Sequence, residues 1–300
     1  MNPRVGVIGV GAMGMGIAKA LLGKGFRVTV RDIVAAREAE AESAGARRAS
    51  SPAALAAECD VVLTVVIDAE QTRTVAYTGD RPLVPSSATS GLSPVVMMCS
   101  TIAPSDTEEV AARLGAHGIA MLDAPISGGP ARAHAGTLSM MAAGADAAFE
   151  RCKPVIDAIA TNCFRISARP GDGSRMKVVN NMLAAANLAA GCEAMALAGR
   201  LGLDLRQAAE VVNASSGGSW IFADRMARAL EGDYAPRAAA RVLRKDVSLF
   251  VSEARALGLE ATLAEAAQRV FEDTVARGFA EEDDAAVLKR YAALWSVELP

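Results

Sequence analysis

The stretch VGVIGVGAMGMGIAKALLGKGFRVTVRD, residues 5–32, decides the fold of the first half of the chain. An apolar run leads directly into G-x-G-x-x-G, which is followed by a helix-like segment and a second apolar run ending at Asp32. In a β-α-β unit, Gly9 allows the tight turn, Gly11 lets backbone approach a pyrophosphate, and Gly14 lets the helix pack on the strand. The helix N-terminus attracts phosphate through its free N–H groups. The stretch therefore predicts a dinucleotide site rather than an unrelated glycine-rich loop.

Asp32 favours NAD over NADP. A carboxylate at the end of the second strand can accept hydrogen bonds from the adenosine ribose hydroxyls, and it would repel a 2′-phosphate. Ile33 stands where a phosphate-binding protein would carry a cation, although Arg31 could turn toward such a phosphate. We therefore expect NAD as the cofactor, with NADP as the lesser alternative.

Composition is that of a globular protein without a nucleic-acid partner. The 300 residues are 52% hydrophobic and 22% charged, with a net charge of -3 and no basic stripe. The five cysteines are scattered without C-x-x-C, which predicts reduced thiols, a cytoplasmic location and no metal site. Asn187, Glu193 and Arg200 interrupt the apolar segment 182–201, so we expect a buried helix rather than a membrane span.

Strand and helix patterns alternate up to about residue 165, which predicts a doubly wound α/β domain. From about residue 173 only helical patterns remain. We therefore expect an NAD-binding Rossmann domain over 1–168 and an all-helical substrate and oligomerisation domain over 169–300, joined by a long helix over 174–201. A substrate would bind in the cleft between two such domains. The expected strands are 5–10, 27–32, 61–66, 95–99, 120–124 and 139–143. The expected helices are 13–24, 35–44, 52–58, 70–75, 105–114, 174–201, 204–213, 220–230, 238–257, 261–277 and 284–295.

Lys177 is the best candidate for a proton carrier. A protein that moves hydride to or from a dinucleotide also needs a general acid or base near the reacting carbon. His117 lies in a turn-like loop before a predicted strand, where a solvated role is expected, and His134 lies nearer to the glycines of the 123–138 segment and is the lesser catalytic alternative. Lys177 lies early in the long helix among apolar residues, which disfavour an ammonium group. Asn181, four residues later, shares its helix face and could bind substrate or fix the lysine rotamer. A surface lysine with an apolar stem explains the same spacing equally well.

Two further polar segments each follow a predicted strand. Ser127, Gly128 and Gly129 offer a hydroxyl and backbone N–H groups that could surround a substrate carboxylate, although a plain tight turn explains them equally well. Ser100 and Thr101 offer hydroxyls that could face the nicotinamide ribose or amide.

Together these segments resemble the β-hydroxyacid dehydrogenase family, which includes 3-hydroxyisobutyrate dehydrogenases and tartronate semialdehyde reductases. Four motifs carry the resemblance in order: the glycine-rich opening at 9–16, D-A-P-V-S-G-G with A-x-x-G-T-L at 123–138, G-x-G-x-x-x-K-x-x-N-N at 171–181, and K-D at 245–246. The resemblance implies that Lys177 is the catalytic acid/base assisted by Asn181, that Ser127, Gly128 and Gly129 hold substrate, and that the enzyme forms a homodimer or homotetramer. The implied cofactor-binding residues are Gly9, Gly11, Ala12, Met13, Gly14, Asp32, Val66, Ser100, Thr101 and Lys245.

Three segments of the second half resemble the L-threonate dehydrogenases within this family, namely 218–222, 232–237 and 282–287. By this resemblance Trp220 and Phe222 line or close the substrate pocket, although their spacing alone is typical of helix core. L-Threonate dehydrogenases have a histidine and a glutamine where Asn180 and Asn181 stand, and the paired asparagines look more like the 3-hydroxyisobutyrate branch. The expected substrate is therefore L-threonate or a similar three- to four-carbon hydroxy acid, with 3-hydroxyisobutyrate, tartronate semialdehyde or succinic semialdehyde as alternatives.

The expected function is an NAD-dependent dehydrogenase of a small hydroxy acid. Imine reductases share the architecture but usually carry Asp or Tyr at the position of Lys177. Decarboxylating 6-phosphogluconate enzymes have a much longer helical domain. A non-catalytic nucleotide-binding scaffold is the alternative of a different class, and such proteins lose the catalytic lysine that is present here.

Overall fold

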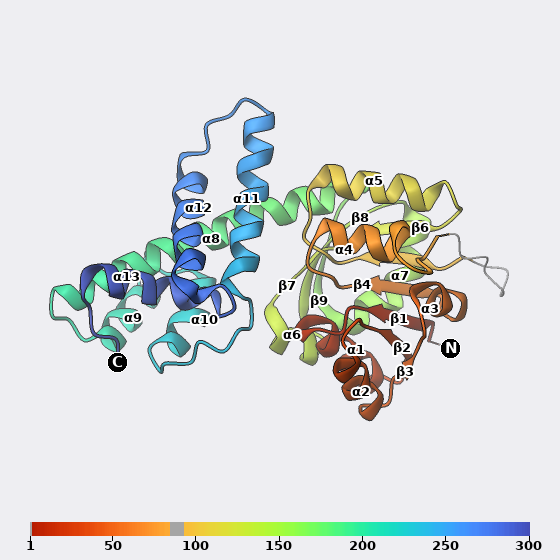
Figure 1. Cartoon of the computed structure of the whole chain (residues 1–300), viewed down its shortest axis with the longest axis horizontal. Helices are drawn as coiled ribbons and strands as arrows, with labels where there is room; N and C mark the ends of the chain where they lie inside the picture. Colours follow the sequence, from red (N-terminus) through yellow and green to blue (C-terminus); the bar gives the residue numbers. More distant parts are fainter. Residues whose placement is uncertain (1, 85–92) are drawn as a thin grey trace. The chain divides into compact units, whose positions relative to one another are not determined.

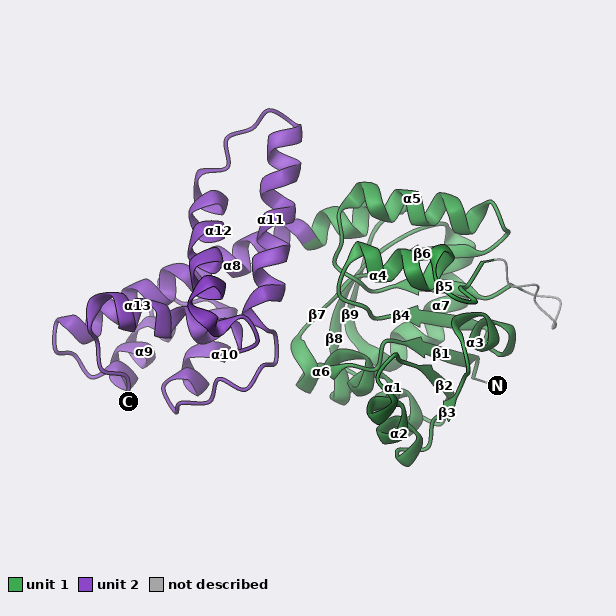
Figure 2. Cartoon of the chain, viewed as in Figure 1, with its two compact units in different colours: residues 1–177 green, residues 178–300 purple. Residues whose placement is uncertain are grey.

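The structure is a computed structural model that describes residues 2–84 and 93–300. The chain forms two compact units, Met1–Lys177 (unit 1) and Val178–Pro300 (unit 2), which are coloured separately in Figure 2. Helix α8 (Asp172–Arg200) begins in unit 1 and continues into unit 2 (Figure 1). The division between the units therefore falls inside a helix, a few residues after the expected domain boundary at 168/169.

Unit 1 contains a nine-stranded sheet in the order β3-β2-β1-β4-β5-β6-β8-β7, with β9 paired to β8. Pairings from β3 through β6 are parallel, whereas β8 runs antiparallel to β6 and β7. This order confirms the predicted doubly wound fold. Strands β3, β7 and β9 were not predicted, because two of them are two-residue strands and β9 is largely exposed. The bounds are β1 Arg4–Ile8, β2 Arg27–Arg31, β3 Arg47–Arg48, β4 Val61–Thr64, β5 Val95–Met98, β6 Ala120–Asp123, β7 Ile126–Ser127, β8 Leu138–Ala143 and β9 Ala160–Ser167.

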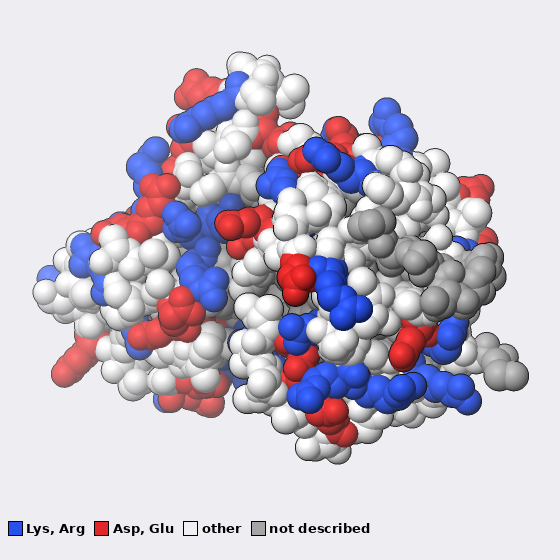
Figure 3. Space-filling model, turned by 45° about the vertical axis from the view of Figure 1, so that its right-hand side comes forward, with Lys and Arg blue, Asp and Glu red and all other residues white. Residues whose placement is uncertain are grey.

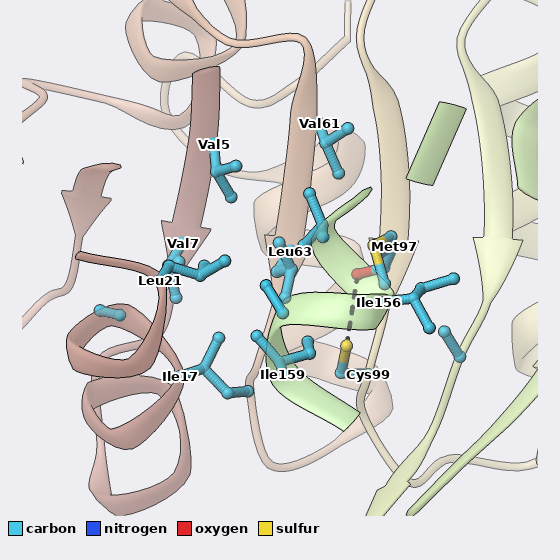
Figure 4. Packing of buried hydrophobic residues seen from close by; sticks show 14 of the residues in the cluster. Val5, Val7, Ile17, Leu21, Val61, Leu63, Met97, Cys99, Ile156 and Ile159 are labelled. Atoms are coloured by element: carbon cyan, nitrogen blue, oxygen red, sulfur yellow. Dashed lines mark hydrogen bonds between the residues drawn. The ribbon is translucent and has the colours of Figure 1, made fainter. Parts of the chain in front are cut away.

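Helices cover both faces of this sheet. Successive strand residues point to opposite faces, so Val7 packs with Ile17 and Ile159 on one side (Figure 4), whereas Ile8 joins Leu55 on the other. Burial on both faces explains why these strands are continuous apolar runs. Helices α6 and α7 were not predicted, and Pro154 inside α7 is a residue that helix interiors usually exclude. The bounds are α1 Ala12–Gly23, α2 Ala35–Ser43, α3 Pro52–Glu58, α4 Ala69–Arg73 with η1 Thr74–Thr78, α5 Pro104–Gly115, α6 Gly129–Ala135 and α7 Asp146–Ile159.

Unit 2 is built from helices around a core of its own, as predicted. Leu188 and Cys192 of α8 lie in this core with Phe222 and Phe271. Nearby, the Trp295 ring packs edge-on against Tyr291, with 5.3 Å between the ring centroids. Besides α8, the bounds are α9 Leu205–Asn213, α10 Trp220–Ala229, α11 Ala240–Ala256, α12 Thr262–Thr274 with η2 Val275–Phe279, η3 Asp284–Ala286 and α13 Val287–Trp295.

A buried ion-pair network ties α10 to the segment that begins η3. Arg225 Nε lies 2.5 Å from Asp284 Oδ1, and Arg228 Nη2 lies 3.1 Å from Asp283 Oδ2. Burial raises the pKa of Asp284 to about 7, although the neighbouring Arg225 guanidinium opposes the shift. The network gives the 282–287 motif a structural role within unit 2, because each buried carboxylate depends on an arginine from α10.

Helix α8 is long and apolar enough, by length and composition, to cross a membrane, but one of its faces packs into the core of unit 2. Another face exposes Met176, Val179, Leu183 and Leu197, which we call the α8 stripe. Their spacing of three or four residues places the first three on one side of the helix. On the face drawn in Figure 3, acidic and basic side chains lie next to one another. We therefore interpret α8 as a core helix with one exposed apolar face.

Candidate functional site

The glycine-rich loop closes on itself in a way that two of its glycines require. Gly9 has φ +89°, and a Cβ there would lie 2.4 Å from the Val65 carbonyl oxygen. A Cβ on Gly14 would lie 1.9 Å from the Gly9 carbonyl oxygen. At Gly11, by contrast, the nearest atom of the described chain to a Cβ would be Arg37 Nη1, at 3.8 Å. The loop is thus packed at its ends and open in the middle, on the side where a pyrophosphate is expected.

Helix α1 begins directly after this opening. Gly11 is its N-cap, and Ala12 and Met13 form its first turn. The first N–H groups of a helix have no partner within the helix, and the helix dipole favours an anion there. The first turn of α1 contains no acidic side chain that would compete for this position. The start of α1 therefore suits a phosphate group.

Asp32 holds the glycine-rich loop to the end of β2. One carboxylate oxygen accepts a hydrogen bond from the Val10 N–H (2.8 Å) and the other from the Val34 N–H (2.9 Å). This supporting role was not anticipated from the sequence. Each carboxylate oxygen can accept a further hydrogen bond, so the predicted contact with ribose hydroxyls is compatible with it.

Arg37, rather than Arg31, is the cation that lies beside the Asp32 carboxylate. Arg31 donates to Glu38 Oε1 (2.8 Å) and to the Asp32 carbonyl oxygen (2.7 Å), so it is engaged elsewhere. Arg37 Nη1 lies 3.9 Å from Asp32 Oδ1 and faces the open side of Gly11. Ile33 is 92% exposed. Sequence reasoning missed Arg37 because it lies on the first turn of α2, six residues after β2 ends.

Two buried hydroxyls lie at the carboxyl edge of the sheet. Thr64 ends β4, and Ser100 follows the neighbouring strand β5 by two residues. Neither hydroxyl has a hydrogen-bond partner among the residues that the structure describes. An unpaired buried hydroxyl costs about 1–3 kcal/mol, so a bound polar group would stabilise it. Thr64 was missed in the sequence, where it appears only as a polar residue within an apolar run.

The remaining unit 1 cofactor candidates lie near the same edge. Val66 Cγ1 would be 3.2 Å from a Cβ on Gly9, which places it beside the glycine-rich loop. Thr101 follows Ser100 and is half-buried. Open sheets of this type bind ligands at the carboxyl ends of their strands. The glycine-rich loop, the start of α1 and the unpaired Ser100 hydroxyl together fit a dinucleotide.

The Ser127-Gly128-Gly129 segment is a turn that needs its glycines. Ser127 ends β7, and Gly128 and Gly129 have φ +131° and +73°. A Cβ on Gly128 would also lie 2.7 Å from Arg132 Cδ. The segment is therefore a tight turn, one of the two interpretations of its sequence. Ser127, the last residue of β7, is half-buried.

The histidines and cysteines of the chain have the following environments. His117 and His134 are exposed, and all five cysteines are free thiols. Within residues 2–84 and 93–300, no three His, Cys, Asp or Glu side chains are grouped so as to hold a metal ion.

Lys177 and Asn181 lie on one buried face of α8. Lys177 is 6% exposed and Asn181 is 8% exposed. Ser174, which is also buried, precedes Lys177 by three residues on the same face. The alternative interpretation of Lys177 as a solvated surface lysine does not agree with this burial.

Asp246 joins two of the predicted site residues within unit 2. Asn181 Nδ2 donates to Asp246 Oδ2 (2.6 Å), and Lys245 Nζ donates to Asp246 Oδ1 (2.6 Å). Asn180 Nδ2 in turn donates to Asn181 Oδ1 (3.0 Å). Asp246 itself is buried on α11. Sequence reasoning named Lys245 but assigned no role to the acid next to it.

The two aromatic candidates of α10 have different environments. Trp220 is 53% exposed at the first position of the helix. Phe222 is buried in the core of unit 2, and its Cδ2 atom stands 2.4 Å from where a Cβ on Gly191 would be. Phe222 therefore has a packing role, and the pocket-lining role expected for it does not agree with this position.

Comparisons with known proteins cover both units. Residues 4–167 match the NAD binding domain of 6-phosphogluconate dehydrogenase, and residues 171–291 match the NAD-binding family of NADP-dependent 3-hydroxyisobutyrate dehydrogenase. L-Threonate dehydrogenase of Escherichia coli K12 is 39% identical over 294 residues, 97% of this chain and 95% of that protein. The Cupriavidus necator L-threonate dehydrogenase is 37% identical over 302 residues, 100% and 99% of the two chains. A crystal structure of a Salmonella typhimurium 3-hydroxyisobutyrate dehydrogenase superimposes with TM-score 0.87 at 39% identity, covering 96% of this chain and 100% of that one.

Proposed function

The chain belongs to the β-hydroxyacid dehydrogenase family, in the 3-hydroxyisobutyrate dehydrogenase-like branch and its L-threonate dehydrogenase subgroup, and we propose that it oxidises L-threonate or a similar three- to four-carbon hydroxy acid. It is an oxidoreductase that acts on CH–OH groups with a nicotinamide dinucleotide. The observation that carries the proposal is the burial of Lys177 on the same face of α8 as Asn181.

Each group of the site has a distinct role in the proposed reaction. The dinucleotide, when bound, supplies the hydride acceptor. Neutral Lys177 takes the hydroxyl proton as hydride leaves the carbinol carbon, so that the alcohol becomes a carbonyl. Asn181, oriented by its hydrogen bond to Asp246, assists at the substrate hydroxyl. Ser127 and the backbone N–H groups of Gly128 and Gly129 hold the substrate carboxylate.

We also propose that NAD is preferred over NADP. The Asp32 carboxylate would repel a 2′-phosphate, and the exposed Ile33 offers no cation to it. Arg37 Nη1, 3.9 Å from Asp32 Oδ1, reduces this repulsion. The repulsion is not removed, because two backbone hydrogen bonds hold the Asp32 carboxylate in place. A ratio of kcat/KM for the two cofactors that favours NADP would contradict this assignment.

The α8 stripe supports self-association as a homodimer or homotetramer. Its apolar side chains are exposed over the length of a helix, and burying them against a second copy would stabilise the assembly. Sedimentation analysis should find an oligomer that Leu183→Glu dissociates while Val211→Glu, at an exposed position of α9, does not. A monomeric wild type would contradict this. A cytoplasmic location is proposed from the five free thiols.

The proposed activity is tested with a panel of L-threonate, D-glycerate and 3-hydroxyisobutyrate, with NADH formation as the readout. L-Threonate should give the highest kcat/KM. Lys177→Ala should lose about 100- to 10,000-fold in kcat, as expected for a general acid or base, while NADH affinity measured by calorimetry is kept. Lys153→Ala, an exposed lysine paired with Asp157 on α7, is the matched control. Absence of turnover with every acid, or near-normal turnover by Lys177→Ala, would contradict the proposal.

3-Hydroxyisobutyrate is the second candidate substrate. The pair Asn180 and Asn181 favours it by resemblance, because paired asparagines at these positions look more like the 3-hydroxyisobutyrate branch than like L-threonate dehydrogenases. A higher kcat/KM for 3-hydroxyisobutyrate than for L-threonate would select this candidate and leave the reaction class unchanged. Tartronate and succinic semialdehydes, tested as substrates for NADH oxidation, examine the reductive direction.

A further inference from the structure

A fully buried carboxylate connects the end of β6 to the start of α8. Asp123 Oδ2 accepts hydrogen bonds from the Gly171 N–H (2.8 Å) and the Ser174 N–H (2.9 Å). Asp123 Oδ1 accepts a third from Ser174 Oγ (2.9 Å). All four groups belong to unit 1. The first N–H groups of a helix lack acceptors within the helix. The Asp123 carboxylate, at the end of a strand that is distant in the sequence, accepts hydrogen bonds from two N–H groups at the start of α8.

The two glycines of the 171–181 motif make this close approach possible. Gly171 has φ +99°, a conformation that favours glycine. A Cβ on Gly173 would lie 2.6 Å from the Met141 carbonyl oxygen and 3.0 Å from Asp123 Cγ. A larger residue at either position would therefore push the start of α8 away from the sheet.

A third element, α5, holds the same turn. Ser174 Oγ lies 2.8 Å from Thr107 Oγ1, and both hydroxyls are buried. Outside this buried contact, Arg175 pairs with Glu108 of α5 at 2.6 Å. The first turn of α8 is thus fixed from the sheet by Asp123 and from α5 by Thr107.

We propose that Asp123 is a positioning residue that sets the place of Lys177 by holding the first turn of α8. The inference rests on the proposed function, in which Lys177 carries the proton. Lys177 follows Ser174 by three residues, about 4.5 Å along the helix axis, so any shift of the first turn is passed to it. Catalytic groups must be held to within about 0.5 Å of their working geometry. Asp123 also precedes Ser127 by four residues, so one side chain relates the proposed substrate turn to the proposed proton carrier.

Asp123→Ala and Asp123→Asn separate positioning from bulk. Asparagine can place its carbonyl oxygen where Oδ2 accepts two N–H groups and turn its amide toward Ser174 Oγ, whereas alanine keeps no acceptor. Asp123→Ala should lower kcat about 100-fold, the cost expected for a misplacement of about 1 Å, with KM for NAD little changed. Asp123→Asn should recover most of this loss. Equal losses in the two variants, or a loss in NAD binding in place of kcat, would overturn the proposal.

Hydrogen exchange of the backbone N–H groups of residues 169 and 171–178 provides a readout that does not need turnover. Exchange there should be faster in Asp123→Ala than in Asp123→Asn or wild type. If wild type oxidises no hydroxy acid, the proposed function fails while this measurement still tests the hold on α8. Ser174→Ala keeps the backbone N–H that donates to Asp123 but loses the hydrogen bond from Oγ. Its kcat should fall less than that of Asp123→Ala, and it replaces Asp123→Ala as the test variant if that protein does not fold. Unchanged exchange and unchanged kcat in Ser174→Ala would overturn the proposal.

Discussion

Gly11→Ala should weaken cofactor binding and leave the fold intact. The backbone at Gly11 has φ -66° and ψ -166°, which alanine adopts readily, and its Cβ would come no closer than 3.8 Å to an atom of the described chain. Stability should therefore stay level or rise by about 0.4–1 kcal/mol. The added methyl group occupies the side from which the pyrophosphate must approach. Overpacking costs about 1–3 kcal/mol, which corresponds to a rise in Kd for NADH of about 5- to 150-fold.

Two glycines of the same helix serve as controls. Gly14→Ala would put a Cβ 1.9 Å from the Gly9 carbonyl oxygen, so it should lower stability as well as affinity. Gly23→Ala meets no atom of the described residues within 4 Å and should change neither NADH binding nor, except for a small gain, stability. Calorimetric titration with NADH and urea unfolding followed by circular dichroism measure the two quantities. Wild-type affinity in Gly11→Ala would refute the placement of the pyrophosphate against this loop, and a lowered urea midpoint would refute the claim of open space.

Three further predictions concern charged side chains. Burial raises the pKa of Asp123 to about 6, above the value of about 3.9 for an unfolded aspartate. Ionisation of Asp123 therefore lowers the free energy of unfolding. This loss of stability begins near pH 4 and reaches about 3 kcal/mol above pH 6. Asp123→Asn should remove this component, so the stability difference between variant and wild type should increase with pH up to about 6 in urea titrations, and a pH-independent difference would contradict the burial argument. Asp32→Asn should raise kcat/KM with NADP, because Arg37 then faces the 2′-phosphate without a competing carboxylate. Adding Arg37→Gln to this variant should cancel the gain. An unchanged kcat/KM with NADP in Asp32→Asn would count against Asp32 as the residue that discriminates between the two cofactors. Arg225→Ala should cost about 3–5 kcal/mol because it leaves Asp284 buried without its guanidinium, and a urea midpoint like that of wild type would show that the network is dispensable.

The sheet and most helices could be predicted because their signals are local. Mostly apolar runs such as the one between Asp60 and Asp68, where a strand is expected over 61–66, indicate strands wherever they lie in the chain. The two-residue strands β3 and β7 have no such signal, since they exist through pairing with β2 and β8. The α7 helix was hidden by Pro154 in its interior.

The site was predicted in part for a similar reason. Motifs made Lys177, Asn181 and the Ser127 turn candidates, but a contact between distant segments leaves no pattern in either one. Asp123 is the first residue of the D-A-P-V-S-G-G motif, yet its hydrogen bonds with Gly171 and Ser174 form only when β6 meets the start of α8. In the same way, the buried position of Phe222 depends on a glycine in another helix, which its own sequence neighbourhood does not reveal.

The packing of Trp295 against Tyr291 has a practical use. Both tryptophans of the chain, Trp220 and Trp295, lie in unit 2, and Tyr77 is the single tyrosine of unit 1. A change in indole emission therefore reports the unfolding of unit 2 and hardly responds to the unfolding of unit 1. The emission of bound NADH would report the unfolding of unit 1, where the predicted dinucleotide site lies. Emission recorded at both wavelengths in one heating run would show which of the two units unfolds at the lower temperature.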